Sequence, residues 1–180
     1  MRDWNVIVSV YDGGFRRAFQ FLQTLGTVAK SGFFNVLVMK VDDIPAFLEA
    51  VLEHGAADPD LFSRSISRIV PLTTTFVFQS PEEFETKAKE AVAPWTSVLG
   101  NQTFHIRMHR RGFAGRLSSQ AEERFLDEFL LQRLEEAGTP GRIAFADPDF
   151  IIAVETLGPQ AGLSLWRRED LQRYPFLKVD

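Results

Sequence analysis

Residues 104–112 have the sequence FHIRMHRRG, in which apolar and cationic side chains alternate. In an extended strand Phe104, Ile106 and Met108 share one face, and the histidines and the arginine between them share the other. Alternation of this kind is typical of a strand with one face on a core and one face in solvent. The stretch therefore predicts a half-buried strand with a cationic outer face.

Helix and strand signals follow this stretch. Ser119-Gln120-Ala121-Glu122 has the form of a capping box, which predicts a helix start at Ser119. The helix continues to Gly138 with one apolar stripe, made of Phe125, Leu126, Phe129, Leu130 and Leu134. Three more strands are predicted, over residues 142–145, 150–155 and 162–166.

The first part of the chain predicts strands and helices in the order βαββαβ. This order matches the ferredoxin-like split motif, an antiparallel sheet with two helices on one face. A second capping box, Ser80-Pro81-Glu82-Glu83, opens a new helix and places the domain boundary at Gln79–Ser80. The prediction is an α+β protein with a ferredoxin-like domain at 1–79 and a second α/β domain at 80–180. The predicted elements before the boundary are strands at 6–10, 27–30, 34–41 and 69–78 and a helix over 15–25. A second helix, which Asp42 or Asp43 can cap, has Phe47, Leu48, Val51 and Leu52 on one face and ends at Gly55.

Composition excludes several protein classes. The chain has 180 residues, of which 45% are hydrophobic and 24% charged, with a net charge of −4 and no cysteine. These values fit a globular protein and exclude disulfides and thiolate chemistry. No apolar run approaches the roughly 18 residues that span a bilayer, and no signal peptide opens the chain. We expect a soluble protein of the cytoplasm with no membrane partner.

Candidate catalytic groups are few. His105 and His109 lie four residues apart, but zinc needs further ligands that the sequence does not supply nearby. The acids Asp147, Asp149 and Glu155 could hold magnesium, although a proline between two aspartates is first a turn signal. Asp12-Gly13-Gly14 lacks the lysine and the other glycines of a phosphate-binding P-loop. We therefore expect no enzyme activity, no catalytic residue, no metal and no cofactor.

Residues 105–116, here named the arginine island, contain four arginines, two histidines and no acid. Arginine matches phosphate in a two-pronged geometry. The glycines at 112 and 115 would let a ligand approach the backbone, and the start of the next helix adds free N–H groups. The alternative is a solvated surface paired with Glu122, Glu123 and Glu128 of that helix. Surface pairs are worth under about 1 kcal/mol, so phosphate binding explains the concentration of arginine better.

The C-terminal part resembles a THUMP domain, the RNA-binding module of thiouridine synthases, RNA methylases and pseudouridine synthases. The resemblance covers about residues 80–180 and rests on three motifs in order: residues 104–112, residues 147–155 (DPDFIIAVE) and the closing Tyr174-Pro175-Phe176-Leu177. A ferredoxin-like unit commonly precedes such domains. The resemblance implies contact with the acceptor end of tRNA near its single-stranded 3′ terminus.

The resemblance also implies which residues contact RNA. From the matched stretch these are Arg107, His109, Arg110 and Arg111, with Gly112 allowing close backbone approach. To them we add, from charge and position alone, Arg116, Arg167 and Lys178.

The chain looks like the stand-alone THUMP type, similar to the adaptor that helps a separate acetyltransferase make N4-acetylcytidine in tRNA. The expected function is a non-catalytic RNA-binding adaptor whose partners are tRNA and a separate RNA-modifying enzyme. Its negative net charge departs from the basic character expected of THUMP proteins that hold tRNA. The alternative is a protein-interaction or ligand-binding module that has a ferredoxin-like unit and does not bind RNA.

Overall fold

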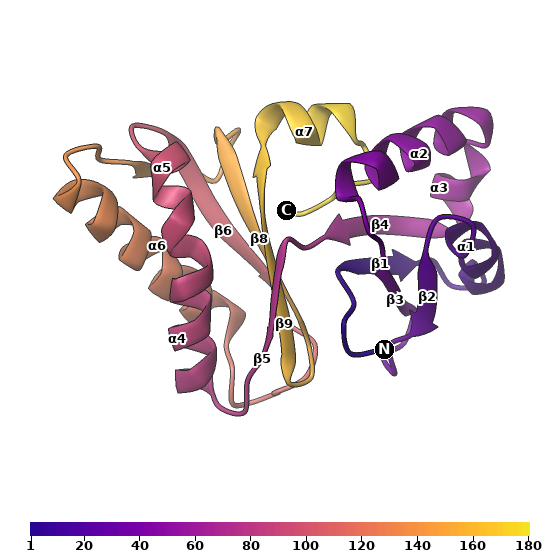
Figure 1. The fold of residues 1–180 in the computed structure, drawn as a ribbon, viewed down its shortest axis with the longest axis horizontal. Helices are drawn as coiled ribbons and strands as arrows, with labels where there is room; N and C mark the ends of the chain where they lie inside the picture. Colours follow the sequence, from indigo (N-terminus) through magenta and orange to yellow (C-terminus); the bar gives the residue numbers. More distant parts are fainter. The chain divides into compact units, whose positions relative to one another are not determined.

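The computed structural model describes all of residues 1–180, which form a mixed α/β fold with two sheets (Figure 1). The chain divides into two compact units. The first unit comprises Met1–Leu72 and Gln172–Lys178, and the second comprises Thr73–Leu171 and Val179–Asp180.

The first sheet has the strand order β2-β3-β1-β4, and all neighbouring strands are antiparallel. Its central strands are apolar and almost fully buried, as their β-branched sequences predict. The helices α1 and α2 of this unit are in contact, since the ring centroids of Phe21 and His54 lie 4.5 Å apart. The elements of the first unit are β1 (Val6–Val10), α1 (Phe15–Leu22), β2 (Thr27–Lys30), β3 (Val36–Lys40), α2 (Ile44–Ala57), α3 (Asp60–Arg64) and β4 (Ile66–Pro71).

The predicted strand at 69–78 is divided between the two sheets. Residues up to Pro71 form the end of β4, whereas Thr74–Val77 form β5 at the edge of the second sheet. The first unit consequently ends at Leu72, before the boundary that the sequence places at Gln79–Ser80.

The tail returns to the first unit because it is apolar and completes an open strand edge. Phe176 is buried, and its carbonyl accepts a hydrogen bond of 3.0 Å from the N–H of Ile69 in β4. The 80–180 domain of the sequence analysis therefore lacks residues 172–178 in the structure.

The second sheet has the order β5-β9-β8-β6-β7, with β6 parallel to both β7 and β8 and the remaining pairs antiparallel. Figure 1 shows α4 and α6 side by side on one face of this sheet. Besides β5, the elements of the second unit are α4 (Pro81–Val92), a 3-10 turn (Ala93–Trp95), α5 (Thr96–Leu99), β6 (Thr103–His109), α6 (Ser119–Glu136), β7 (Arg142–Ile143), β8 (Phe150–Leu157), β9 (Gln160–Arg167) and α7 (Arg168–Arg173).

The core of the second unit lies between this sheet and its helices. The apolar residues of β6 pack against Leu126, Leu130 and Leu134 of α6, all three fully buried. The alternation in residues 104–112 is thus confirmed on its apolar side. None of the helices is long and apolar enough to cross a membrane.

The start of α6 differs by one residue from the predicted capping box. Ser118 is the cap, and its hydroxyl accepts a hydrogen bond from the N–H of Ala121. Glu122 therefore lies one residue beyond the position that the acid of a capping box takes. It is buried, with 5% of its surface exposed. Burial, together with the nearby charges of Glu85 and Glu82 of α4, raises its pKa to about 7.

Beyond the short strand β7, the edge of β6 has no neighbouring strand. Two more acids of α6 accept hydrogen bonds from its backbone N–H groups there. The N–H of Met108 donates to Oε1 of Glu123 at 2.7 Å, and the N–H of Ile106 donates to Asp127. Carboxylates spaced four residues apart on the helix thus substitute for a neighbouring strand. Glu123 is thus engaged by the backbone of β6, whereas the alternative interpretation paired it, with Glu122 and Glu128, with the arginine island.

Candidate nucleic-acid interface

The cationic face of β6 is only partly exposed. His105 is 2% exposed, and the ring of Phe145 lies 5.4 Å from it in an edge-on arrangement. Burial lowers the pKa of His105, although Asp180 opposes that effect. The expectation that this histidine belongs to a solvent-facing cationic surface is wrong, because its side chain is buried.

Arg107 is about half exposed, and its Nε lies 3.3 Å from Oδ1 of Asp180. The same oxygen lies 3.8 Å from Nε2 of His105. Arg107 is therefore positioned at the surface with a carboxylate beside it, so a phosphate would have to compete with that carboxylate.

Arg111 forms the strongest structural contacts of the island. Its Nη1 donates to Oε2 of Glu155 at 2.7 Å, and Glu155 is fully buried in β8. His109 shares this partner, with Nδ1 lying 3.6 Å from Oε1 of Glu155. The backbone N–H of Arg111 also donates to Oγ1 of Thr156 at 3.0 Å. Arg111 thus neutralises a buried carboxylate and His109 lies beside that carboxylate, which gives both residues a structural role.

Gly112 allows a close backbone approach, but the approaching backbone belongs to this chain. Its φ is +95°, and a Cβ at this position would lie 2.7 Å from Cα of Gly158, in the turn between β8 and β9. The N–H of Gly158 donates to the carbonyl of Arg111 at 2.7 Å, which holds the two segments together. The glycine is required by the fold of the second unit.

Arg110 and Arg116 are brought together at the start of α6. They line a hollow of about 430 Å3 whose other walls are Gly115 and residues 117–120, and no acidic side chain lines it. Arg110 donates from Nη1 to the carbonyl of Gly112. The guanidinium of Arg116 lies 4.8 Å above the ring of Phe113, which in turn packs against Phe78. Both cations thus contact neutral groups, and Arg116 also interacts with the carboxylate of Glu82 in α4, whose pKa it helps to lower.

The hollow has the properties of an anion site. Its floor is the first turn of the 18-residue helix α6, where the N–H groups of Ser119 and Gln120 have no partner within the helix. The helix dipole adds partial positive charge at this end. The sequence predicted the arginines and the helix start, but not which cations would remain without a carboxylate. Gln120, a further amide donor, was missed because only the fold shows that it faces this hollow.

Of the two remaining predicted residues, one lies apart from this hollow and the other belongs to the first unit. Arg167 stacks above Phe150 at 5.1 Å, at the start of β8, whereas Glu155 beside Arg111 lies five residues further along that strand. Five residues of strand span about 16 Å. Lys178 belongs to the first unit, where its carbonyl accepts a hydrogen bond of 2.9 Å from Nε of Arg68. Charge and sequence position alone therefore did not group these residues with the others.

The acids considered for magnesium do not form one site. Asp149 accepts hydrogen bonds from the N–H and the hydroxyl of Thr103 at 2.8 and 2.9 Å, which lowers its pKa. Arg168 pairs with both Asp147 and Asp149. Glu155 lies six residues beyond Asp149, about 20 Å away along β8, and pairs with Arg111. Each carboxylate thus has a structural partner.

Comparison with known proteins found no matching family and no matching curated protein. Solved structures do match. The chain is similar to TrmN from Thermus thermophilus, with a TM-score of 0.62 and 14% identity over 89% of this chain and 44% of that one. It is similar to PH1313 from Pyrococcus horikoshii Ot3, with a TM-score of 0.56 and 13% identity over 90% of this chain and 54% of that one.

A third similar structure is a 4-thiouridine synthetase in complex with RNA and ATP. Its TM-score is 0.54, with 14% identity over 92% of this chain and 42% of that one. The chain thus spans about half of the length of these three proteins. At such identities the similarity shows the fold alone, and that fold is THUMP-like, as the resemblance of residues 80–180 implies.

Proposed function

We propose that this protein binds RNA through the hollow at the start of α6 and holds the acceptor end of tRNA there. The observation that supports this most is the pairing of Arg110 and Arg116 beside unpartnered helix N–H groups, with no acidic side chain in the lining. The similarity to a synthetase solved with RNA agrees with it.

The hollow suits a phosphate of the RNA backbone. The loop at 110–117 supplies the side chains of Arg110 and Arg116 to the hollow, and the first turn of α6 supplies backbone N–H groups. Charge-assisted hydrogen bonds to phosphate oxygens are about twice as strong as neutral ones. Because Phe113 supports the guanidinium of Arg116, less side-chain freedom is lost when RNA binds.

We further propose that the protein is a non-catalytic adaptor that presents tRNA to a separate modification enzyme. Supporting this, Asp147, Asp149 and Glu155 are all engaged by arginines in structural pairs. We interpret the first unit as ferredoxin-like because its sheet is antiparallel with the order β2-β3-β1-β4 and its helices α1 and α2 are in contact. Such a unit would accompany the RNA-binding unit, as the family resemblance implies.

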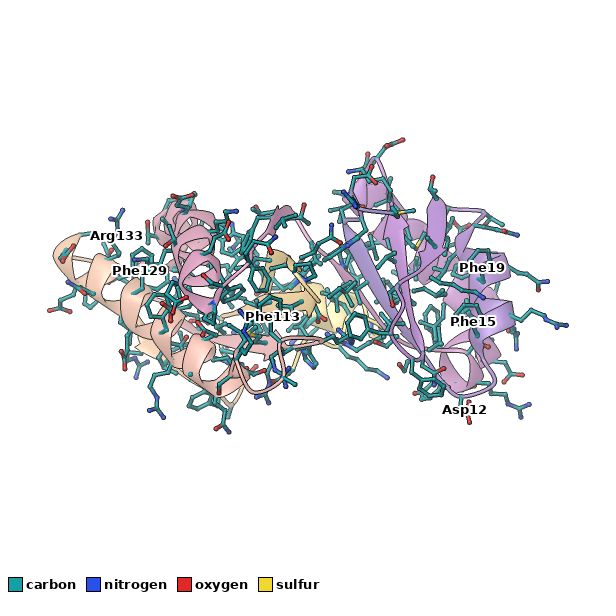
Figure 2. All side chains as sticks on the ribbon, turned by 90° about the horizontal axis from the view of Figure 1, so that it is seen from below. Asp12, Phe15, Phe19, Phe113, Phe129 and Arg133 are labelled. Carbon is teal, nitrogen blue, oxygen red and sulfur yellow. The ribbon has the colours of Figure 1, made fainter.

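Binding of total tRNA to the full chain tests the RNA-binding proposal. Arg110→Ala combined with Arg116→Ala should weaken binding. The slope of log affinity against log salt should become shallower by about one for each phosphate that the variant no longer binds. Arg133→Ala is the matched control, because Arg133 lies in the last turn of the same helix, about 20 Å from its start (Figure 2). Equal weakening by both variants would show that binding follows overall charge and would contradict the proposed site.

The adaptor role has its own test. A strain that lacks the protein should lose one modified tRNA nucleoside, and the wild-type chain should restore it whereas the Arg110→Ala, Arg116→Ala variant should not. Turnover of tRNA by the purified protein without a second enzyme would contradict the non-catalytic role.

An apolar groove supports the alternative of a protein-interaction module. It has a volume of about 420 Å3 and lies wholly within the first unit, lined among others by Leu52, Phe62 and Phe176. An electrophoretic shift against total tRNA at low salt separates the two functions. Absence of any shift favours the alternative.

A further inference from the structure

Two aromatic rings on the outer side of α1 lie outside the core of the first unit. The helix buries Ala18, Phe21 and Leu22, whereas Phe15 and Phe19 are only partly buried. Figure 2 shows Phe15 and Phe19 one above the other along this helix. Their ring centroids are 6.2 Å apart and their planes differ by 22°. Phe15 and Phe19 continue the apolar stripe of Ala18 and Leu22 beyond the buried residues, and such exposed apolar surface on a helix indicates a binding surface.

Cations and amides surround these rings, in what we name the α1 patch. It is a depression of about 550 Å3 lined by Phe15, Arg16, Phe19, Gln20, Gln23 and Lys30, without any acid. Nζ of Lys30 lies 5.5 Å from the centroid of the Phe15 ring. Arg17, the neighbour of Arg16, is bonded to Asp58 at 2.7 Å, whereas Arg16 is exposed and lines the depression. The patch therefore combines ring faces with positive charge.

This combination fits unpaired nucleotides better than a peptide. Bases without a pairing partner expose flat faces that stack on aromatic side chains, and their phosphates need cations nearby. The amides of Gln20 and Gln23 supply both donors and acceptors for base edges. An acidic peptide would use the two cations but would have no need for parallel ring faces.

We propose that the α1 patch binds unpaired nucleotides of RNA, with bases stacked on Phe15 and Phe19 and phosphates contacted by Arg16 and Lys30. The proposal rests on the RNA-binding function proposed above. It adds to the phosphate hollow of the second unit a stacking site in the first unit.

The test measures binding of fluorescently labelled oligoadenylate to the full chain by anisotropy. Phe15→Leu combined with Phe19→Leu keeps the apolar volume but removes the ring faces, and should weaken binding about tenfold or more. Phe15→Tyr combined with Phe19→Tyr keeps the faces and should bind as the wild type does. The salt dependence should stay the same in both variants, because no charge changes. Unchanged binding by the leucine variant would overturn the proposal.

Further measurements separate this proposal from the proposed function. Arg16→Ala, an exposed substitution that leaves the core intact, should reduce the salt dependence of oligoadenylate binding by about one. If tRNA binding depends on Arg110 and Arg116 while the leucine and Arg16 variants bind oligoadenylate normally, only the α1 patch proposal fails. If the wild-type chain binds neither RNA, the proposed function fails and the patch proposal with it. If the leucine variant loses a partner protein but retains oligoadenylate, the patch is a protein surface and the proposal is overturned.

Discussion

Arg110 and Arg111 are adjacent in the sequence but have different surroundings. Arg110 lines the hollow at the start of α6, whose lining contains no acidic side chain, whereas Arg111 is paired with the buried Glu155 at 2.7 Å. Removing one member of a buried ion pair leaves the other charge without compensation, which costs about 3–5 kcal/mol. The first arginine is therefore free to act in binding, and the second is required for folding.

Arg111→Ala should lower the free energy of unfolding by up to about 3 kcal/mol, since His109 still faces Glu155 and reduces the loss. Arg110→Ala should change it by less than about 0.5 kcal/mol, as at an ordinary surface position. Urea unfolding of both variants measures the difference. Combining Arg111→Met with Glu155→Leu should restore most of the stability, because the uncompensated charge is then gone. Equal stability of the two single variants would contradict the structural role assigned to Arg111.

Local pattern predicted the strand at 104–112 and its two faces but not the partners of its cations. The two faces of the strand follow from the two-residue period of extended backbone alone. The pairing of Arg111 with Glu155, 44 residues away, depends on the parallel alignment of β6 with β8, in which His109 faces Glu155. A single acid inside the apolar sequence of β8 was the available signal for a buried ion pair.

At the scale of elements, α6 presents buried acids to its neighbours. Glu122 faces Glu82 and Glu85 of α4, and its Oε2 has no hydrogen-bond partner. Burial raises its pKa from 4.5 to about 7. The carboxyl therefore contributes stability that is complete below about pH 4.5 and is lost as pH rises through about 7.

Glu122→Gln should consequently stabilise the protein by about 1–3 kcal/mol at about pH 8 and by much less at about pH 5. Glu123→Gln is the control, because it makes the same substitution at the next residue and the amide oxygen of glutamine can still accept the N–H of Met108. Asp149, whose pKa is lowered, affects stability only at pH values below this window. Chemical unfolding at both pH values measures the effect. A stabilisation that is the same at both would rule out titration of Glu122.

Helix and strand order was largely predictable, and sheet membership was not. The proline and capping signals placed α4 correctly, and Ser80 does accept the N–H of Glu83 at 3.1 Å. The run at 69–78 gives no sign that it belongs to two sheets, because both parts are β-rich. The tail at 172–178 returns to the first unit through its buried aromatic residues, a long-range contact that no local period shows.

For the whole molecule, the net charge of −4 limits how RNA can be bound. Arg107 and Arg111 pair with carboxylates, so the phosphate hollow retains Arg110 and Arg116 as its cations, and Glu82 of α4 interacts with Arg116. A protein that neutralises Z phosphates shows a slope of about −0.9Z in a plot of log affinity against log salt. Because this molecule has few available cations, its affinity for RNA should fall only slowly as the salt concentration rises.

We expect a slope of about −2 to −3 for duplex tRNA between about 50 and 200 mM salt, equivalent to two or three phosphates. Arg107→Ala should leave this slope unchanged, because Asp180 already balances that cation, whereas Arg116→Ala should reduce it by about one. Anisotropy titrations at several salt concentrations measure both slopes. A slope steeper than about −5 would mean that the carboxylate-paired arginines change partner when RNA arrives, and the binding surface would then extend along β6 beyond the hollow.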